Sequence, residues 1–180
     1  MAEINSKPDY RYLIDKHKSL AFNIALKITQ NEQDAEEVVQ DSFLKAFSGL
    51  KCFKHESQFS TWFYRIVYNT AISSIRSKKT WSVDIDTRIN ESIDNNQIEN
   101  ALKRLTDHDR KQLITEAMSK LGELDYTLLT LFYFQELRIK DIAKIVKQKP
   151  NYIKVLLQRA RIKLYNLLST PIKNELKELI

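Results

Sequence analysis

The sequence predicts an all-α protein of two small helical domains joined by a linker, the second domain containing a helix-turn-helix. The 180 residues are 43% hydrophobic, which is enough for a folded core. Only two glycines and three prolines are present, too few for the many tight turns of a sheet protein. Apolar residues recur mostly at the spacing of an amphipathic helix. These observations predict helices along most of the chain.

Apolar spacing predicts three helices in the first part of the chain. They cover residues 8–29, 34–48 and 58–77, and Gly49 closes the second of them. Their apolar stripes can face one another, so they predict one three-helix domain over residues 1–79.

An acidic, polar segment follows over residues 80–109. It has few large apolar groups to bury, and its acids are Asp84, Asp86, Glu91, Asp94, Glu99, Asp107 and Asp109. We expect a linker here, with a helical turn or two around residues 98–105. Periodicity returns over residues 110–180, the second predicted domain. It predicts helices at 110–120, 124–135, 138–146 and 151–168, with a short tail after Pro171.

Cysteine usage and hydropathy predict a cytoplasmic protein. Cys52 is the single cysteine and cannot form an internal disulfide, and the start MAEINSKPDYRY lacks the apolar core of a secretory signal. No apolar run is long enough to span a membrane. The formal net charge of +6 favours a polyanionic partner, and residues 147–163 contain six bases and no acid.

Acidic residues gather on one side of the helix predicted at 34–48. On a helical wheel the inner side holds Ala35, Val39, Ser42, Phe43, Ala46 and Leu50. The outer side holds Asp34, Glu37, Asp41 and Leu44. A solvated surface accounts for the charges alone, whereas an apolar side chain beside aligned carboxylates is typical of a protein-binding patch. The residues leave both interpretations open.

The helix predicted at 58–77 is apolar around most of its circumference, which indicates burial on several sides. A narrow polar strip remains, and two lysines follow it: Arg65, Asn69, Arg76, Lys78 and Lys79. Such groups suit phosphate binding, and Phe59 and Trp62 suit stacking on unpaired bases. For the aromatic residues, packing in the core is the competing interpretation.

Residues 137–168 have the pattern of a helix-turn-helix, with Pro150 suited to the first position of the second helix. The core face of that helix is Ile153, Leu156, Leu157, Ala160 and Leu164. Its outward or flanking residues are Asn151, Lys154, Val155, Gln158, Arg159 and Arg161. Amides and bases of this kind contact base edges and phosphates, and a valine can contact a thymine methyl. A helical hairpin with a solvated basic side is the alternative.

The sequence indicates no catalytic activity. Cys52 and His55 have the spacing of two metal ligands, but there is no second cysteine, and His17 and His108 lie in other predicted elements. No glycine-rich phosphate loop is present, and no nucleophile can be placed beside a base. We therefore expect no enzyme, no metal and no cofactor. A stand-alone helix-turn-helix regulator and a protein that only sequesters a partner remain as alternatives, although neither uses all the charged surfaces.

Two parts of the chain resemble the sigma-70 family of bacterial transcription factors, in the small extracytoplasmic-function (ECF) class. The stretches DAEEVVQDSFLKAF and STWFYRIVYNTAISSIR resemble the second conserved region of the family. The stretches KLGELDYTLLTLFYFQELRIKDIAKIV and YIKVLLQRARIKL resemble the fourth. The two regions occur in the family order, and together they cover most of the chain.

The resemblance implies an initiation factor that binds core RNA polymerase, directs it to specific promoters and helps melt the minus-ten element. The acidic helix would dock on the clamp coiled coil of the largest polymerase subunit through Asp34, Glu37, Gln40, Asp41 and Leu44. The loop at 51–59 and the helix after it would hold the minus-ten strand through His55, Ser57, Phe59, Trp62, Arg65, Asn69, Arg76, Lys78 and Lys79. The linker would thread near the active-centre cleft and the RNA exit path.

The helix-turn-helix would recognise the minus-thirty-five element through Asn151, Tyr152, Lys154, Val155, Gln158, Arg159 and Arg161. Factors of this class are commonly held inactive by an anti-sigma protein, so the resemblance adds an anti-sigma factor as a candidate partner that would hold the chain near the membrane. Several positions depart from the family pattern. Ser73 replaces an acid, Gly122 a proline, Tyr126 an arginine and Tyr152 a small hydroxyl residue, and Glu136, Lys147 and Asn151 replace glycines.

Overall fold

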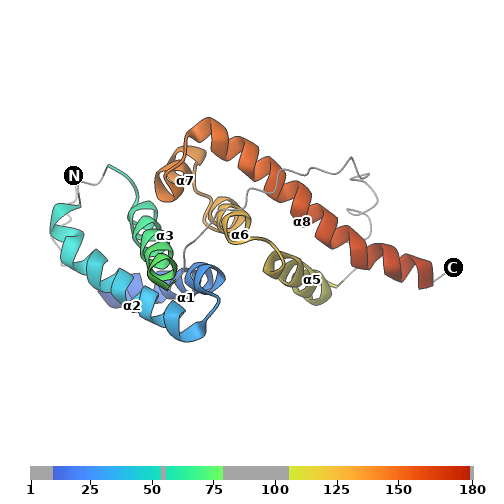
Figure 1. The fold of residues 1–180 in the computed structure, drawn as a ribbon, viewed down its shortest axis with the longest axis horizontal. Coiled ribbons are helices and arrows are strands. Elements are labelled where there is room, and N and C mark those ends of the chain that lie inside the picture. Colours follow the sequence, from blue (N-terminus) through green and yellow to red (C-terminus); the bar gives the residue numbers. More distant parts are fainter. Residues whose placement is uncertain (1–9, 54–55, 79–105, 179–180) are drawn as a thin grey trace. The chain divides into compact units, whose positions relative to one another are not determined.

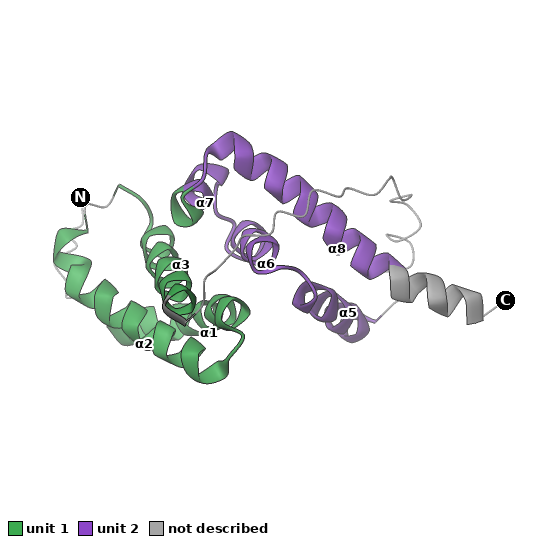
Figure 2. Ribbon diagram, viewed as in Figure 1, with its two compact units in different colours: residues 1–81, 144–147 green, residues 82–143, 148–180 purple. Residues whose placement is uncertain are grey.

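The computed structural model describes residues 10–53, 56–78 and 106–178, with the side chains of 77–78 and 170–178 excepted. Every regular element within these ranges is helical, which confirms the predicted all-α class (Figure 1). None of the described helices is long and apolar enough to cross a membrane. The structure divides into two compact units, residues 1–81 and 82–180, except that residues 144–147 are grouped with the first (Figure 2).

The first unit is a bundle in which each long helix packs on the other two. Its elements are α1 (Tyr10–Thr29), α2 (Glu32–Gly49), the short 3₁₀ turn η1 (Leu50–Cys52) and α3 (Phe59–Lys78). The three long helices confirm the predicted ones to within two residues at each described end. Helix α2 begins before Asp34 because the Asn31 side chain accepts a 3.0 Å hydrogen bond from the Asp34 N–H and caps the helix.

Aromatic rings fill the centre of the first unit. Phe63 and Tyr64 of α3 are fully buried, and the Phe43 ring of α2 lies 4.5 Å from that of Phe63. His17 of α1 is buried among these rings, with its Nδ1 2.9 Å from the Tyr64 hydroxyl. Burial, with a smaller contribution from the charge of Lys16, lowers the pKa of His17, and burial raises the pKa of Tyr64. This packing confirms that α3 is buried on several sides.

The described residues 106–178 form five helical elements, most of them in the second unit. They are α5 (Asp107–Ser119), α6 (Glu123–Leu129), the π-helical turn η2 (Thr130–Phe134), α7 (Ile139–Val146) and α8 (Pro150–Glu178). Helix α5 begins three residues before the predicted position 110. Thr106 caps it by accepting a 3.2 Å hydrogen bond from the Asp109 N–H, and the Thr106 hydroxyl donates to the Asp109 carboxylate at 2.6 Å. The spacing of Thr106 and Asp109 is that of a capping box, a signal the periodicity analysis missed.

The single helix predicted at 124–135 is wrong in its second half, where the backbone widens into η2. The Leu137 N–H donates to the Leu131 carbonyl at 3.1 Å across this end, and Glu136 adopts the left-handed conformation with φ 51°. A π-turn inserts a residue into the helical repeat, so a search for a 3.6-residue period cannot detect it. Unlike Phe134, which is left exposed, Leu131 is fully buried.

The turn between α7 and α8 has the geometry of a Schellman cap. Lys147 has φ 55°, and the Gln148 N–H donates to the Ala143 carbonyl at 3.0 Å. Pro150 then begins α8, as predicted, because its missing N–H would be unpaired at that position in any case. The helix-turn-helix at these residues is therefore confirmed.

The predicted end of α8 is wrong. The helix was expected to stop near Leu168, with a short tail after Pro171, but it continues through Pro171 to Glu178. Proline removes one backbone hydrogen bond from a helix while its fixed φ remains compatible with helical backbone. The residues that follow include lysine, glutamate and leucine, which have high helix propensity and extend the helix beyond the proline.

Aliphatic side chains form the core of the second unit. The buried set from α6, η2, α7 and α8 includes Leu128, Leu129, Leu131, Ile142, Ile153 and Leu157. One ion pair accompanies them: Lys163 Nζ of α8 lies 2.7 Å from Asp125 Oδ2 of α6, and the Asp125 side chain is only 11% exposed. This pair fixes α6 against the middle of α8.

Candidate functional site

The acidic side of α2 lies on the surface of the first unit, as the helical wheel predicted. Glu37, Gln40 and Asp41 are exposed, Asp34 is half-buried, and Leu44 is 65% exposed although it is a large apolar residue. Their spacing of three and four residues places all five on one face of the helix. We call Asp34, Glu37, Gln40, Asp41 and Leu44 the acidic face.

A single lysine borders the acidic face. Lys45 Nζ lies 3.7 Å from Asp41 Oδ2 in an exposed pair, and it also donates to the Thr70 hydroxyl of α3 at 3.3 Å. An exposed pair of this length holds the carboxylate only weakly. Asp41 therefore stays open to a stronger cationic partner.

The inner side of α2 needs one correction. Val39 and Leu50 were expected inside, but both are half-buried, and Val38 takes the core position with 2% exposure. Val38 is three residues after Ala35 and four before Ser42, both fully buried, so it lies on the centre line of the buried stripe. Residues Phe43 and Ala46 are buried as predicted.

The loop after α2 carries an aromatic cluster. The Trp62 ring lies 4.9 Å from Phe53 and 5.8 Å from Phe59, and the Phe59 ring stacks on Phe63 at 5.8 Å with an interplanar angle of 7°. Gly49 makes room for the indole, because a Cβ at that position would lie 3.2 Å from Trp62 Cζ2. Phe59 and Trp62 are half-buried, so packing and an exposed ring face occur together.

The polar strip of α3 is present on its described part. Arg65 and Arg76 are exposed, and Asn69 is half-buried with its Nδ2 donating to the Arg65 carbonyl at 2.6 Å. Ser57, at the loop end before α3, is half-buried. The structure describes the backbone of Lys78 but not its side chain, and His55 and Lys79 lie outside the described residues.

The outward side of α8 gathers four of the residues predicted for it. Asn151, Lys154 and Gln158 are exposed, and Val155 is 43% exposed. On the opposite side Ile153, Leu156, Leu157 and Ala160 are buried, as predicted, whereas Leu164 is only half-buried. We call Asn151, Lys154, Val155 and Gln158 the recognition face. Its two amides and one ammonium match the donors and acceptors of base edges.

Three other predicted residues lie at the borders of this face. Tyr152 and Arg159 are half-buried, and the Arg159 Nε is shielded from solvent. Arg161 is exposed, but its guanidinium lies 5.7 Å above the Phe132 ring and 5.9 Å from the Tyr133 ring of η2. The structure thus places these three side chains beside the recognition face rather than within it.

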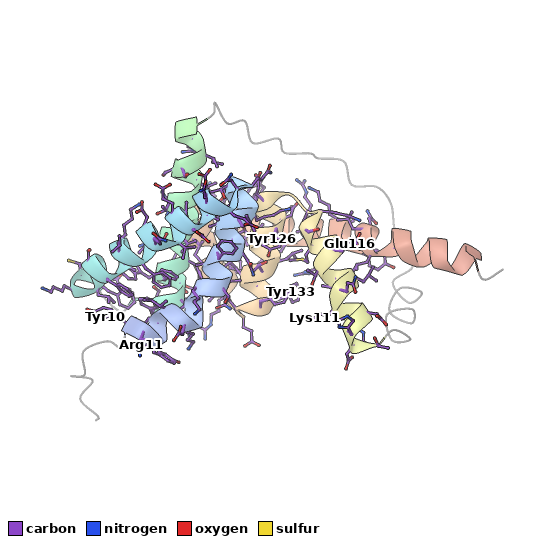
Figure 3. The ribbon with its side chains drawn as sticks, turned by 90° about the horizontal axis from the view of Figure 1, so that it is seen from below. Tyr10, Arg11, Lys111, Glu116, Tyr126 and Tyr133 are labelled. Atoms are coloured by element: carbon purple, nitrogen blue, oxygen red, sulfur yellow. The ribbon has the colours of Figure 1, made fainter. Side chains whose placement is uncertain are left out.

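Sequence reasoning missed the aromatic residues of η2. Tyr133 is 54% exposed and Phe134 is 64% exposed, and Figure 3 labels Tyr133 on this segment. The signal was present in the run TLLTLFYF, because consecutive large apolar residues cannot all face one side of a helix. Some of them had to be exposed.

The described cysteine and histidines have different environments, and His55 lies outside the described residues. Cys52 is exposed in the first unit, while His17 is buried there and bound to Tyr64; His108 is exposed on α5 of the second unit. No group of three or more potential metal ligands occurs among the residues that the structure describes.

Comparison with protein families gives two matches. Residues 13–80 match the model of sigma-70 region 2, and residues 111–164 match the model of sigma-70 region 4. The acidic face, the aromatic cluster and the polar strip up to Lys79 lie in the first range, and the recognition face lies in the second. The order of the two regions is the one expected from the resemblance.

Similar proteins of known identity are sigma factors. RNA polymerase sigma factor SigV of Bacillus subtilis is 30% identical over 147 residues, which cover 82% of this chain and 83% of that protein. The RNA polymerase sigma-H factor of Pseudomonas aeruginosa is 27% identical over 162 residues, covering 86% and 83%. The ECF RNA polymerase sigma factor SigW of Bacillus subtilis is 26% identical, covering 83% of each chain.

Solved structures share the fold. The sigma factor RpoE in complex with the anti-sigma factor NepR, from Bartonella quintana, aligns with a TM-score of 0.60 and 21% identity over 91% of this chain and 99% of that one. CnrH in complex with the cytosolic domain of CnrY aligns with a TM-score of 0.58 and 19% identity over 92% and 90%. With both family regions matched in order and a relative at 30% identity over most of its length, this chain belongs to the sigma-70 family of RNA polymerase sigma factors, in the ECF class of transcription initiation factors.

Proposed function

We propose that this chain binds bacterial core RNA polymerase, directs it to specific promoters and helps melt the minus-ten element. One observation carries the proposal: a single chain presents an acidic helix face with an exposed leucine in its region 2 and a basic recognition face in its region 4. A stand-alone helix-turn-helix regulator would use only the second of these surfaces.

The functions divide between the two domains. Residues 1–79 bind polymerase and the minus-ten element, and the domain that begins with α5 at Asp107 binds the minus-thirty-five element. The acidic segment between them connects the two and runs through the polymerase. Its acidity suits a path along basic protein surfaces.

The acidic face docks on the clamp coiled coil of the largest polymerase subunit. Leu44 supplies the buried apolar contact, and the carboxylates of Glu37 and Asp41 orient the partner through its basic side chains. Asp34 and Gln40 complete the same contact from the two sides of the face.

The loop at 51–59 and α3 hold the non-template strand of the minus-ten element. Arg65 and Arg76 contact phosphates, and the open faces of Phe59 and Trp62 stack on bases. The remaining contacts come from His55, Ser57, Asn69, Lys78 and Lys79. Binding of unstacked bases supplies the free energy that favours the open duplex, so the chain needs no catalytic group for this step.

The recognition face enters the major groove of the minus-thirty-five element. Asn151 and Gln158 contact base edges, Lys154 contacts guanine or phosphate, and Val155 contacts a thymine methyl. Tyr152, Arg159 and Arg161 contact the sugar-phosphate backbone from the borders of that face. The chain acts in the cytoplasm, where the polymerase is, and an anti-sigma protein holds it inactive there until a signal arrives.

Charge reversal on each face tests whether the acidic face binds polymerase and the recognition face binds DNA. Lys154→Glu should abolish transcription from a cognate promoter while core binding stays intact. Asp41→Lys should weaken core binding while the isolated protein keeps its residual affinity for minus-thirty-five DNA. The assay is transcription reconstituted with the purified chain and bacterial core polymerase on a pool of promoter fragments, with start sites sequenced. Loss of DNA affinity alone in both variants would contradict the proposal.

Charge reversal in the polar strip of α3 distinguishes the proposed function from the remaining alternative, a protein that only sequesters a partner. Arg65→Glu and Arg76→Glu should lower promoter opening, measured by permanganate reactivity of unpaired thymines, with core binding unchanged. A protein that only sequesters a partner would tolerate both changes.

A further inference from the structure

The acidic face of α2 continues into an aromatic edge that no part of the proposed function uses. Tyr10 lies in the first turn of α1 (Figure 3). Its side chain is 45% exposed. Its ring packs edge-on against Phe47 of α2, with the centroids 4.6 Å apart and an interplanar angle of 69°. Phe47 is three residues after Leu44, so the two side chains are neighbours on the surface of α2. An apolar ridge therefore runs from Leu44 over Phe47 to Tyr10.

This ridge is anchored in the core of the unit. The Phe47 ring lies 5.7 Å from Phe43, whose own ring lies 4.5 Å from the fully buried Phe63. Exposure rises along this chain of rings, from 0% at Phe63 and 7% at Phe43 to 45% at Tyr10. A ring held in this way loses little conformational entropy when a partner covers it.

We propose that Tyr10 is a further contact residue of the polymerase-binding surface, so that a basic side of the clamp coiled coil covers the acidic face and the ridge together. The inference rests on the proposed function of α2. Charge complementarity argues for the basic partner, because Glu37 and Asp41 are exposed beside the ridge and Lys45 is the single base that α2 contributes. Tyrosine is among the residue types that contribute most to binding at protein interfaces.

The chain offers a matched control in Tyr12. This residue is also on α1 and is 57% exposed, but two residues of helix turn it about 200° away from Tyr10. Its hydroxyl accepts a 3.2 Å hydrogen bond from Lys16, whose ammonium lies 5.4 Å from the ring centroid. Tyr12 thus has the same chemistry and more exposure on a different side of the helix.

The first experiment measures the affinity of the fluorescently labelled full chain for core polymerase by anisotropy. Tyr10→Ala should weaken binding by about tenfold, the effect of losing one strong interface residue. Tyr10→Phe should bind as the unsubstituted chain does, because the ring makes the contact. Tyr12→Ala should change the affinity by less than about twofold. Equal effects of the two alanine substitutions would overturn the proposal.

Hydroxyl-radical footprinting of the unsubstituted chain gives a second test that needs no variant. Adding core polymerase should protect Tyr10 from oxidation and leave Tyr12 reactive. Protection of Tyr10 by promoter DNA instead of core polymerase, or no protection by either, would refute the assignment. The Asp41→Lys variant distinguishes a failure of the proposed role of α2 from a failure of the proposed role of Tyr10. If it binds core normally, the proposed role of α2 fails; if it loses binding while Tyr10→Ala does not, only the role of Tyr10 fails.

Discussion

The two units of this sigma factor have the same kind of architecture but different cores. The first is built around rings, Phe43, Phe63 and Tyr64, and encloses a hydrogen-bonded histidine. The second is built around leucines and isoleucines and holds a partly buried ion pair at its surface. Ring packing is directional and leaves polar tips to be paired, whereas aliphatic packing depends on filled volume. Each unit should therefore respond to a different perturbation.

The exposed helices of the two units differ in charge. The acidic face of α2 carries carboxylates around Leu44, and the recognition face of α8 carries an ammonium and amides around Val155. Both faces combine one exposed apolar side chain with aligned polar groups. The partners proposed for the two helices, polymerase for α2 and DNA for α8, follow the sign of the surface charge, since the supporting architecture is similar.

Core truncation should have the largest effect. Phe63→Ala should lower the free energy of unfolding of the first unit by about 3–5 kcal/mol, because it removes a fully buried ring and leaves a cavity. Denaturant unfolding can be followed by tryptophan fluorescence in a Trp81→Phe background, where Trp62 is the remaining tryptophan.

The matched change in the other core is Leu157→Ala. It should cost about 2–5 kcal/mol in the second unit and lower the midpoint of helix loss measured by circular dichroism. The transition of Trp62 should stay in place. A Trp62 transition that moved as far with Leu157→Ala as with Phe63→Ala would show that the two cores unfold together.

Breaking the partly buried ion pair should have the next largest effect. Lys163→Met leaves the nearly buried Asp125 carboxylate without its 2.7 Å partner and should cost about 1–3 kcal/mol. Lys120→Met is the control, because its 2.7 Å pair with Glu116 is exposed and should contribute less than about 0.5 kcal/mol. Thermal unfolding measures both. Equal losses would mean that Asp125 is solvated in the folded protein.

The pH response should distinguish the aromatic core. Burial lowers the pKa of His17, so the unfolded chain binds a proton more readily than the folded one. Stability of the first unit is then complete above pH 6.5, the ordinary histidine value, and falls as the pH drops below it, by at most about 1.4 kcal/mol per pH unit. His17→Gln should flatten this profile, measured as unfolding free energy between pH 7.5 and 5.

His108→Gln is the control for this pH response. His108 is exposed on α5, so its replacement should leave the profile of the first unit unchanged. A profile that persisted in His17→Gln would place the proton uptake on another group.

The smallest effects should come from the backbone of two turns. Glu136 and Lys147 have φ 51° and 55°, a conformation that strains residues with a Cβ. Glycine at either position should raise the unfolding free energy by about 0.5–1 kcal/mol, the relieved strain less the added chain entropy. Gln112→Gly, in the exposed middle of α5, should lower it by about 1 kcal/mol. Chemical denaturation of the three variants shows whether each substitution raises or lowers the unfolding free energy.

These two turns also explain part of the departure from the family pattern. Positions 136 and 147 were noted as places where the family often has glycine, and both adopt a backbone conformation that favours glycine. Gly122, where the family has proline, has φ −64°, a value that proline adopts without strain. The fold is retained because each substituted residue can reach the required backbone angles.

The sequence by itself determined the helical class, the two family regions and the positions of most helices. Each of these depends on local periodicity or on a short motif, and a strongly amphipathic stretch has few other ways to bury its apolar side. The acidic and recognition faces were predictable for the same reason, since spacing alone places Glu37 beside Asp41 and Lys154 beside Gln158.

Only the tertiary structure decided how deeply each side chain is buried and what it touches. Periodicity could not choose between Val38 and Val39, detect the π-turn at η2, or extend α8 past Pro171. It could not reveal that Tyr10 packs on Phe47 or that His17 bonds Tyr64. These contacts join residues far apart in the chain, and their free energy depends on the packing of whole helices rather than on the local sequence.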